Sequence, residues 1–292
     1  MQYDAPIMRR FTLIEPASLD EASNALAEDE EARAIAGGTA LLVMMKLGVF
    51  IPTTLVNLLK LDGLRDITVD GDVLRIGALA SVHDVERHPA VRERYPILAS
   101  ACHVVANIRI RNLATIGGNV ANADYQSDPP AVLLALGASV ELAGPAGGRH
   151  VPLDDFLLGS YETTIGPGEI VTAIHIPPPP PDAVGRYLKF TTRSSEDRPS
   201  AGVAVLSTVR NGVCDDVRIV VGAVSPRPTR VDVAEMARGE RVSPSLIEAM
   251  ARTAAAAVDP VEDLRGSVDY KRRLTEVLTR RLLTESMQGA IA

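Results

Sequence analysis

Five consecutive prolines at residues 177–181 constrain the possible folds of this chain more than any other feature of its sequence. Proline lacks a backbone N–H and has a fixed φ, so such a run enters neither the interior of a helix nor the middle of a sheet. A stiff, extended connection remains. Because the chain has 292 residues and an average domain has roughly 150, the run predicts a boundary between two domains, residues 1–177 and 182–292. The alternative is a proline-rich surface loop within one domain.

Before the prolines, the pattern changes near residue 60, which predicts two subdomains, residues 1–60 and 61–177. In the first, Ser18 and Glu21 form a capping box followed by an apolar stripe, so a helix is expected to about residue 27. The segments that follow predict a strand, a glycine turn, a helix and a second strand, over residues 32–36, 37–38, 40–47 and 54–58.

In the second subdomain, alternating apolar residues around Asp70-Gly71 predict an antiparallel hairpin. Ser81, with Asp84 three residues later, begins a helix, and Pro96 interrupts the helical pattern that comes next. Residues 107–130 are polar and contain glycine, so a long functional loop is expected there. A helix and two strands complete the subdomain, over residues 131–136, 138–142 and 170–176.

After the prolines, the pattern predicts an antiparallel sheet followed by helices. Asn211-Gly212 between two strand patterns is typical of a tight hairpin. Ser243 before Pro244 marks the start of a helix, and an apolar stripe predicts a final helix from about Val268. The strands are expected over residues 186–192, 201–210 and 213–221. The whole chain is therefore predicted to belong to the α+β class.

The charge balance disfavours a nucleic-acid partner. The chain has 30 Lys and Arg against 37 Asp and Glu, which gives a formal net charge of -7. Such a chain repels phosphate backbones unless a local basic patch reverses its field. The two short basic clusters, Arg109/Arg111 and Lys271-Arg272-Arg273, are interpreted as solvated faces.

Cysteine use and hydropathy predict a cytoplasmic protein. Cys102 and Cys214 are the only cysteines, too few for a metal cluster or a disulfide framework, so any metal cluster is expected on another chain. We find neither a secretory leader nor a stretch of about 18 apolar residues, and no membrane span is expected.

The side chains that usually perform catalysis do not occur in recognisable arrangements. None of the five histidines has the i,i+4 spacing of a helical metal pair, and no Gly-x-Ser-x-Gly elbow occurs. Cys102 and His103 are neighbours that would point in different directions on a helix. We therefore assign no catalytic residue and no metal ligand.

Two glycine pairs are candidate anion sites. Gly37-Gly38 lies between a predicted strand and a predicted helix, where glycine permits positive φ and close approach, and where the helix N-terminus offers free N–H groups to a phosphate. The segment is not the Gly-x-Gly-x-x-Gly fingerprint of dinucleotide folds. The alternative interpretation is an ordinary turn that ends the strand and binds nothing.

The second pair, Gly117-Gly118, lies in the predicted long loop. Its backbone N–H groups are candidates for a second phosphate, with the Thr115 hydroxyl and the Asn119 amide beside them. Asp128 is a candidate acceptor from a ribose or ring N–H, and it is equally suited to cap the helix that follows. Two anion sites in one domain suggest a pyrophosphate.

At this point the sequence resembles a known family, the FAD-binding medium subunits of molybdenum hydroxylases of the carbon monoxide dehydrogenase and xanthine dehydrogenase type. The resemblance rests on Ala-Gly-Gly-Thr at residues 36–39, Ile-Arg-Asn-Leu-Ala-Thr-Ile-Gly-Gly-Asn at 110–119, Ser-Asp at 127–128, Gly-Glu-Ile-Val at 168–171 and Tyr-Leu-Lys-Phe at 187–190. It covers essentially the whole chain. It implies an FAD-binding domain of two α/β subdomains, similar to vanillyl-alcohol oxidase, followed by a small α+β domain.

The resemblance also implies which residues bind FAD. It places the two glycine segments on the pyrophosphate, Val105 in the pocket wall, Asp128 on a polar part of the cofactor, and Val171, Lys189 and, with weaker support, Tyr187 beside the flavin. The implied cofactor-binding residues are Ile35, Ala36, Gly37, Gly38, Thr39, Ala40, Leu41, Val105, Thr115, Ile116, Gly117, Gly118, Asn119, Asp128, Val171, Tyr187 and Lys189. Ala40 stands where many relatives have Asp, so any contact made by that carboxylate is absent here.

For the complete enzyme, the resemblance implies a heterotrimer or a dimer of heterotrimers. A large subunit with the molybdenum cofactor would oxidise the substrate, a small subunit with two 2Fe-2S clusters would relay electrons, and this chain would pass them through FAD to a quinone, NAD or oxygen. The alternatives are a stand-alone flavin oxidase of related fold and a redox-inactive nucleotide-binding assembly subunit. The sequence does not select the substrate.

Overall fold

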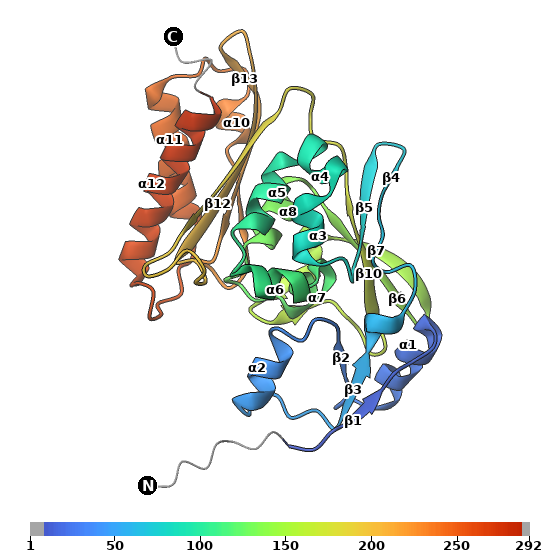
Figure 1. Ribbon diagram of the computed structural model, residues 1–292. Helices are drawn as coiled ribbons and strands as arrows, with labels where there is room; N and C mark the ends of the chain where they lie inside the picture. Colours follow the sequence, from blue (N-terminus) through green and yellow to red (C-terminus); the bar gives the residue numbers. More distant parts are fainter. Residues whose placement is uncertain (1–8, 288–292) are drawn as a thin grey trace, which may run out of the picture.

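The computed structural model describes residues 9–287 and begins with a small parallel sheet. Strands β1 (Thr12–Ile14), β2 (Arg33–Ile35) and β3 (Thr54–Asn57) are ordered β1-β3-β2. Helix α1 (Leu19–Glu28) connects β1 to β2, and its capping box forms as predicted, because the Ser18 side chain accepts from the Glu21 N–H. Helix α2 (Leu41–Lys46) stands apart from the body of the molecule at the end of long connections (Figure 1). A 3-10 turn, Leu58–Lys60, follows β3.

The central unit is a five-stranded antiparallel sheet with helices over one face (Figure 1). Its order is β4-β5-β10-β6-β7, and the predicted hairpin at Gly71 joins β4 to β5. Alternate residues of β5, β6 and β10, such as Ile76, Val140 and Ile174, enter the core. The strands are β4 (Ile67–Asp70), β5 (Val73–Gly77), β6 (Ser139–Gly144), β7 (Gly147–Pro152) and β10 (Ile170–Ile176).

The helices of this unit are short. The predicted break at Pro96 is confirmed, since it separates two helices. After β7 the chain forms one helical turn and a two-stranded ribbon, none of which the sequence predicted. The helices are α3 (Val82–Arg87), α4 (Pro89–Arg94), α5 (Pro96–His103), α6 (Ile108–Leu113), α7 (Ile116–Asn122), α8 (Pro129–Ala135) and α9 (Leu153–Phe156), and the ribbon strands are β8 (Leu157–Gly159) and β9 (Glu162–Thr163).

The long loop predicted at residues 107–130 is wrong, because α6 and α7 lie within it. Asn107 begins α6 by accepting from the N–H groups of Arg109 and Ile110, and Thr115 begins α7 by accepting from the Gly118 N–H. The caps satisfy N–H groups that a glycine-rich, polar segment would otherwise leave to water.

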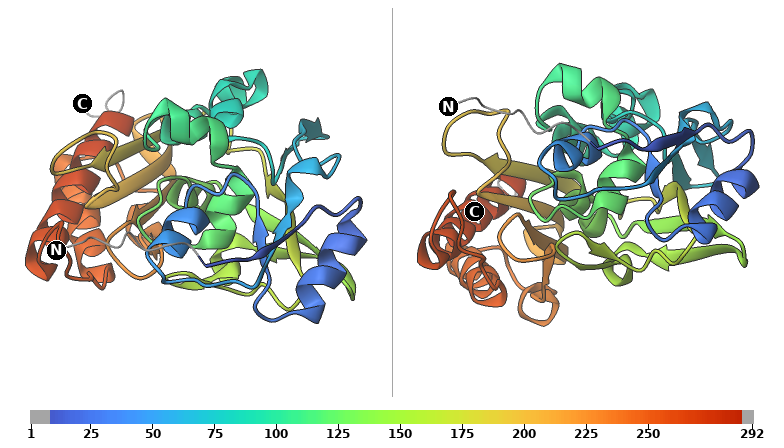
Figure 2. Two further views of the ribbon diagram at one scale, coloured as in Figure 1. Left: turned by 60° about the horizontal axis from the view of Figure 1, so that its bottom comes forward. Right: turned by 90° about the horizontal axis from the view of Figure 1, so that it is seen from below.

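The last unit packs two long helices against an antiparallel sheet of order β11-β12-β13-β14 (Figures 1 and 2). The predicted hairpin forms, with Asn211 at φ 52° and Gly212 at φ 75°, the left-handed pair that a two-residue turn requires. Ser243 caps the predicted helix. The elements are β11 (Val184–Phe190), β12 (Ala201–Arg210), β13 (Val213–Gly222), β14 (Thr229–Val231), α10 (Ala234–Ala237), α11 (Pro244–Ala257) and α12 (Val268–Ser286).

Residues 177–181 connect β10 to β11 and belong to neither strand. Across this connection the two units are in close contact, because Ala204, Leu206 and Val220 of the last sheet join the core of the central unit. Between residues 9 and 287, no helix is long and apolar enough to cross a membrane.

The interpretation of both basic clusters as solvated faces is wrong for one residue in each. Arg111 is largely buried, and its Nε lies 3.2 Å from a Glu86 oxygen. The Lys271 side chain is fully buried, 2.9 Å from Asp263, and donates to the Val261 carbonyl at 2.7 Å. A buried charge must be paired and hydrogen-bonded. The two acids provide the pairing, and Arg111 also donates through Nη1 to the carbonyls of Val105 and Ala106.

Candidate functional site

A cavity of about 830 Å³ lies where the first parallel sheet, the central unit and β11 meet. This volume is toward the upper end of the range for ligand sites, about 300–1,000 Å³, and suits an extended ligand. Most of the residues predicted to bind a cofactor line it: Ile35, Ala36, Gly37, Gly38, Thr39, Ala40, Leu41, Val105, Thr115, Gly117, Gly118, Asn119, Asp128, Val171 and Lys189. Ile116 and Tyr187 do not line it.

The first glycine turn has backbone N–H groups to offer to a ligand. Gly38 has φ +68°, a conformation that disfavours other residues. Within residues 9–287, the N–H groups of Gly38, Thr39 and Ala40 donate to no backbone acceptor, and α2 begins directly after them. Free N–H groups at a helix start attract an anion. The turn therefore suits a phosphate through its backbone alone, and this capacity does not depend on the side chain of residue 40.

The second glycine pair works differently from the prediction. Gly117 packs so closely on β5 and the residues after it that a Cβ would lie 2.4 Å from the Ala78 Cβ. The Gly117 N–H donates to the Ala78 carbonyl at 2.9 Å, and the Gly118 N–H donates to the Thr115 hydroxyl at 3.1 Å. These backbone donors are already satisfied, so the predicted N–H cradle at Gly117-Gly118 is not formed.

Side chains around α7 supply the donors instead. The Thr115 hydroxyl accepts from Gly118, which leaves its own hydrogen free to donate toward the cavity. The Asn119 Oδ1 accepts from the Ser127 hydroxyl at 2.8 Å, so the Asn119 amide nitrogen is the group left for a ligand. The donors available for a second anion are therefore the Thr115 hydroxyl and the Asn119 amide, in the first turn of α7.

Asp128 joins α8 to β11 through a buried network. Tyr187 donates to Asp128 Oδ1 at 2.7 Å, and Lys189 Nζ lies 3.0 Å from Oδ2 while donating to the Val104 carbonyl at 2.8 Å. The side chains of Asp128 and Lys189 are each only 5% exposed. Burial raises the pKa of Asp128, and the Lys189 ammonium and the Tyr187 hydroxyl oppose that rise.

This network corrects two sequence interpretations. Asp128 has helical backbone angles and its side chain makes no capping bond, so the capping alternative is wrong. Tyr187 lies behind Asp128 rather than at the cavity wall, and burial, with the neighbouring carboxylate, raises its pKa well above the ordinary value. Tyr187 is thus placed to hold Asp128 and not to cover a ring. Ile116 is fully buried in the core.

The cavity wall contains residues that the sequence reasoning missed. Asp124 pairs with Arg198 at 2.8 Å, and both residues line the cavity. Arg149 Nε donates to Glu169 Oε1 at 2.6 Å, and the Gly166 N–H donates to Glu169 Oε2 at 2.7 Å. These bonds fix the turn that precedes β10. The Gly-Pro-Gly sequence at residues 166–168 was the available signal for that turn.

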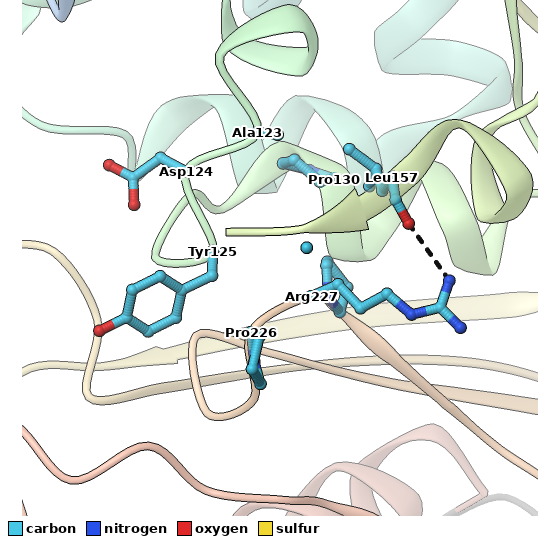
Figure 3. Close-up of a pocket in the computed structure, with 9 residues that line it drawn as sticks. Ala123, Asp124, Tyr125, Pro130, Leu157, Pro226 and Arg227 are labelled. Carbon is cyan, nitrogen blue, oxygen red and sulfur yellow. Dashed lines mark hydrogen bonds between the residues drawn. The ribbon is translucent and has the colours of Figure 1, made fainter. Parts of the chain in front are cut away.

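A second hollow, shown in Figure 3, lies between the α7–α8 connection, β8 and the loop after β13. Arg227 crosses its edge to donate to the Leu157 carbonyl at 3.2 Å. Its volume is about 10 Å³, room for one water molecule. It is a packing gap, so the large cavity is the candidate site.

Comparison with known proteins gives two family matches that together span most of the chain. The model described as the FAD binding domain in molybdopterin dehydrogenase matches residues 9–179. The model described as the CO dehydrogenase flavoprotein C-terminal domain matches residues 186–286.

Individual relatives match over nearly their full length. The nicotine 6-hydroxylase medium subunit of Paenarthrobacter nicotinovorans is 34% identical over 272 residues, 93% of this chain and 95% of that protein. The carbon monoxide dehydrogenase medium chain of Hydrogenophaga pseudoflava is 33% identical over 276 residues, 94% and 96% of the two chains.

Solved structures show the same fold. A chain of carbon monoxide dehydrogenase from Hydrogenophaga pseudoflava has a TM-score of 0.93 at 34% identity, over 98% of this chain and 100% of that chain. A chain of quinoline 2-oxidoreductase from Pseudomonas putida 86 has a TM-score of 0.92 at 30% identity, over 97% and 99%. The α+β architecture expected from the sequence is confirmed.

Proposed function

The chain belongs to the family of FAD-binding medium subunits of molybdenum hydroxylases, and from this premise we propose that it passes electrons from iron–sulfur clusters of a partner subunit through FAD to an external acceptor. It is an oxidoreductase subunit, and its first domain is an FAD-binding domain. The observation that carries the proposal is the 830 Å³ cavity, whose wall unites both glycine segments of the family motif.

The residues present fit FAD. The free N–H groups of Gly38, Thr39 and Ala40 would hold one phosphate, and the Thr115 hydroxyl and Asn119 amide would hold the other. Val105 and Val171 give the cavity apolar wall, which suits a flavin ring. When bound, FAD supplies a redox centre that exchanges one or two electrons, while the protein binds, orients and tunes it.

Lys189 is the positive charge placed to tune such a cofactor. Asp128 and the Val104 carbonyl hold its ammonium group by hydrogen bonds, and Lys189 lines the cavity. A fixed cation stabilises negative charge that develops next to it. Tyr187 supports this arrangement from behind by holding Asp128.

We propose the domain division at residues 177–182, supported by the two family matches, of which the first ends at residue 179 and the second begins at residue 186. For the complex, we propose a large molybdenum-cofactor subunit and a small subunit with two 2Fe-2S clusters, assembled as a dimer of heterotrimers. The relatives named medium chain or medium subunit support such partners. The free thiols of Cys102 and Cys214 suit the reducing cytoplasm. A quinone, NAD or oxygen is the terminal acceptor in this proposal.

A visible absorption spectrum of the protein, purified gently from its own host, tests the proposal. Flavin bands on top of broad iron–sulfur absorption are expected. The iron–sulfur absorption would come from a co-purified partner subunit, because a chain with two cysteines cannot hold two such clusters. A flavin spectrum from a single polypeptide that turns over a substrate would contradict it and would favour a stand-alone oxidase.

A further inference from the structure

Three potential metal ligands meet on the face of the central sheet that is turned away from helices α3 to α8. They are Glu141 of β6, His150 of β7 and His175 of β10, and one ligand atom of each lies within 4.8 Å of the others. Neighbouring positions Val140, Leu142 and Ile174 point to the core, so the alternation of the strands turns these three side chains outward.

The register of the sheet creates the group. Glu141 pairs directly with His150 across β6 and β7, and His175 lies diagonally from Glu141 across β10 and β6. The distance from His175 Nε2 to Glu141 Oε2 is 2.6 Å, and the rings of His150 and His175 meet edge to face with centroids 4.8 Å apart. Three adjacent strands thus bring the three groups together.

We propose that Glu141, His150 and His175 bind a divalent transition-metal ion, with Zn²⁺ the best match. Two imidazoles and one carboxylate are a common zinc donor set, and the fourth position is left to water. Ligand atoms at about 2.0–2.2 Å from one tetrahedral ion lie roughly 3.3–3.6 Å apart. Small side-chain rotations reach this arrangement: the 2.6 Å contact widens as the ion replaces the hydrogen between the two groups, and the separations of up to 4.8 Å close.

The carboxylate is also supported from behind, as outer partners of metal ligands usually provide. The Thr172 hydroxyl donates to Glu141 Oε1 at 2.7 Å, which orients the carboxylate and leaves Oε2 toward the histidines. Arg75 acts in the opposite direction, because its Nε lies 3.6 Å from Oε2 and its charge repels a cation. The affinity therefore depends on two neighbours whose effects have opposite sign.

The site is separate from the proposed flavin site, since none of its three ligands lines the large cavity. It joins the β10 strand, which carries Val171 at the cavity wall, to the edge strand β7 through β6. A bound ion would cross-link these three strands. Its role is thus structural, and its binding does not require FAD.

Calorimetric titration of the full chain with ZnCl₂, after removal of metals by a chelating resin, tests the site. One saturable site per chain is expected, together with a higher unfolding temperature in the presence of Zn²⁺. His150→Ala and His175→Ala should each weaken Zn²⁺ binding by at least about 10- to 100-fold. Removal of a residue that only hydrogen-bonds to a metal ligand already costs that much, and removal of a ligand should cost no less. His150 is exposed on an edge strand, so His150→Ala should fold normally.

Three further variants make the test specific. His103→Ala removes an exposed histidine from a different carboxylate pair, 2.8 Å from Glu86, and should leave the affinity unchanged. Thr172→Val should weaken binding, and Arg75→Gln should strengthen it several-fold. The absence of a saturable site, an affinity that His150→Ala leaves unchanged, or an equal loss in His103→Ala would overturn the proposal.

Discussion

The Leu113 carbonyl oxygen packs directly against Gly37, only 1.7 Å from the position that a Cβ on residue 37 would occupy. The contact is between backbones, so no flexible side chain can move aside. It joins the first glycine turn to the end of α6, two residues before Thr115, which caps α7. The two segments of the cofactor motif are therefore positioned by touching each other.

Gly37→Ala should disrupt this contact. We expect a loss of at least about 1–3 kcal/mol in the free energy of unfolding, the usual cost of overpacking, and a weaker affinity for FAD because the turn and α6 must separate. Thermal unfolding and an FAD titration measure the two effects. Gly148→Ala is the matched control, since its Cβ would have an ordinary contact of 3.5 Å with the Leu142 carbonyl. Equal behaviour of the two variants would contradict the account.

Lys189→Met should leave the Asp128 carboxylate buried without its cation. Breaking one side of a buried ion pair costs about 3–5 kcal/mol, and denaturant unfolding measures the loss. The double variant Asp128→Asn/Lys189→Met should recover part of it, because the uncompensated charge is gone. A loss below about 1 kcal/mol in the single variant would show that Asp128 is not ionised beside Lys189.

Thr115→Val should weaken FAD binding by about 10- to 100-fold, which corresponds to one hydrogen bond to a charged group. It also removes the cap of α7, which costs about 1 kcal/mol of stability. Ser81→Ala separates the two effects, because it removes the cap of α3 at a residue that does not line the cavity. Its stability loss should be similar and its FAD affinity normal. A normal FAD affinity in Thr115→Val would remove this residue from the site.

Stability at acid pH should depend on Glu169. The hydrogen bonds from Arg149 hold the pKa of Glu169 below its ordinary value, against an opposing effect of burial. A lowered pKa in the folded chain means that the contribution is complete above the unfolded carboxyl pKa, about 4.3, and is lost as the pH falls through the lower folded value.

Glu169→Gln should therefore lower the unfolding temperature at neutral pH, and the difference from the unaltered chain should shrink as the pH falls below the ordinary carboxyl pKa. Because the Arg149 side chain is 43% exposed, the difference at neutral pH should be near 1 kcal/mol. Glu162→Gln, at an exposed acid in the same region, is the control and should change the unfolding temperature at neutral pH less than Glu169→Gln does. A constant difference across the pH range would exclude the ion pair as its cause.

Local signals in the sequence predicted most elements. Ser18, Ser243 and the pair Asn211-Gly212 specify their structures through bonds and angles within a few residues, and all three formed as expected. Helix α7 escaped prediction because glycine disfavours helix, and what stabilises it is the contact of Gly117 with Ala78, far away in the chain. The helix propensities of single residues cannot predict a contact with a residue so distant in the sequence.

Contacts between residues of different segments explain the remaining differences. Lys271 was interpreted as exposed because its sequence neighbours are basic, yet Asp263 reaches it across a loop. The role of Tyr187 was missed for the same reason, since Asp128 lies directly before α8 and Tyr187 lies on β11. Glu141, His150 and His175 show no motif in the sequence, because strand register alone brings them together.

Titration of the purified chain, stripped of flavin, with FAD tests the central claim most directly. Binding of one FAD per chain is expected, with strong loss of affinity in Gly37→Ala and Thr115→Val and normal affinity in Gly148→Ala and Ser81→Ala. That pattern would locate the cofactor at the two touching glycine segments. Failure of the folded chain to bind FAD, or binding that all four variants retain, would contradict the claim.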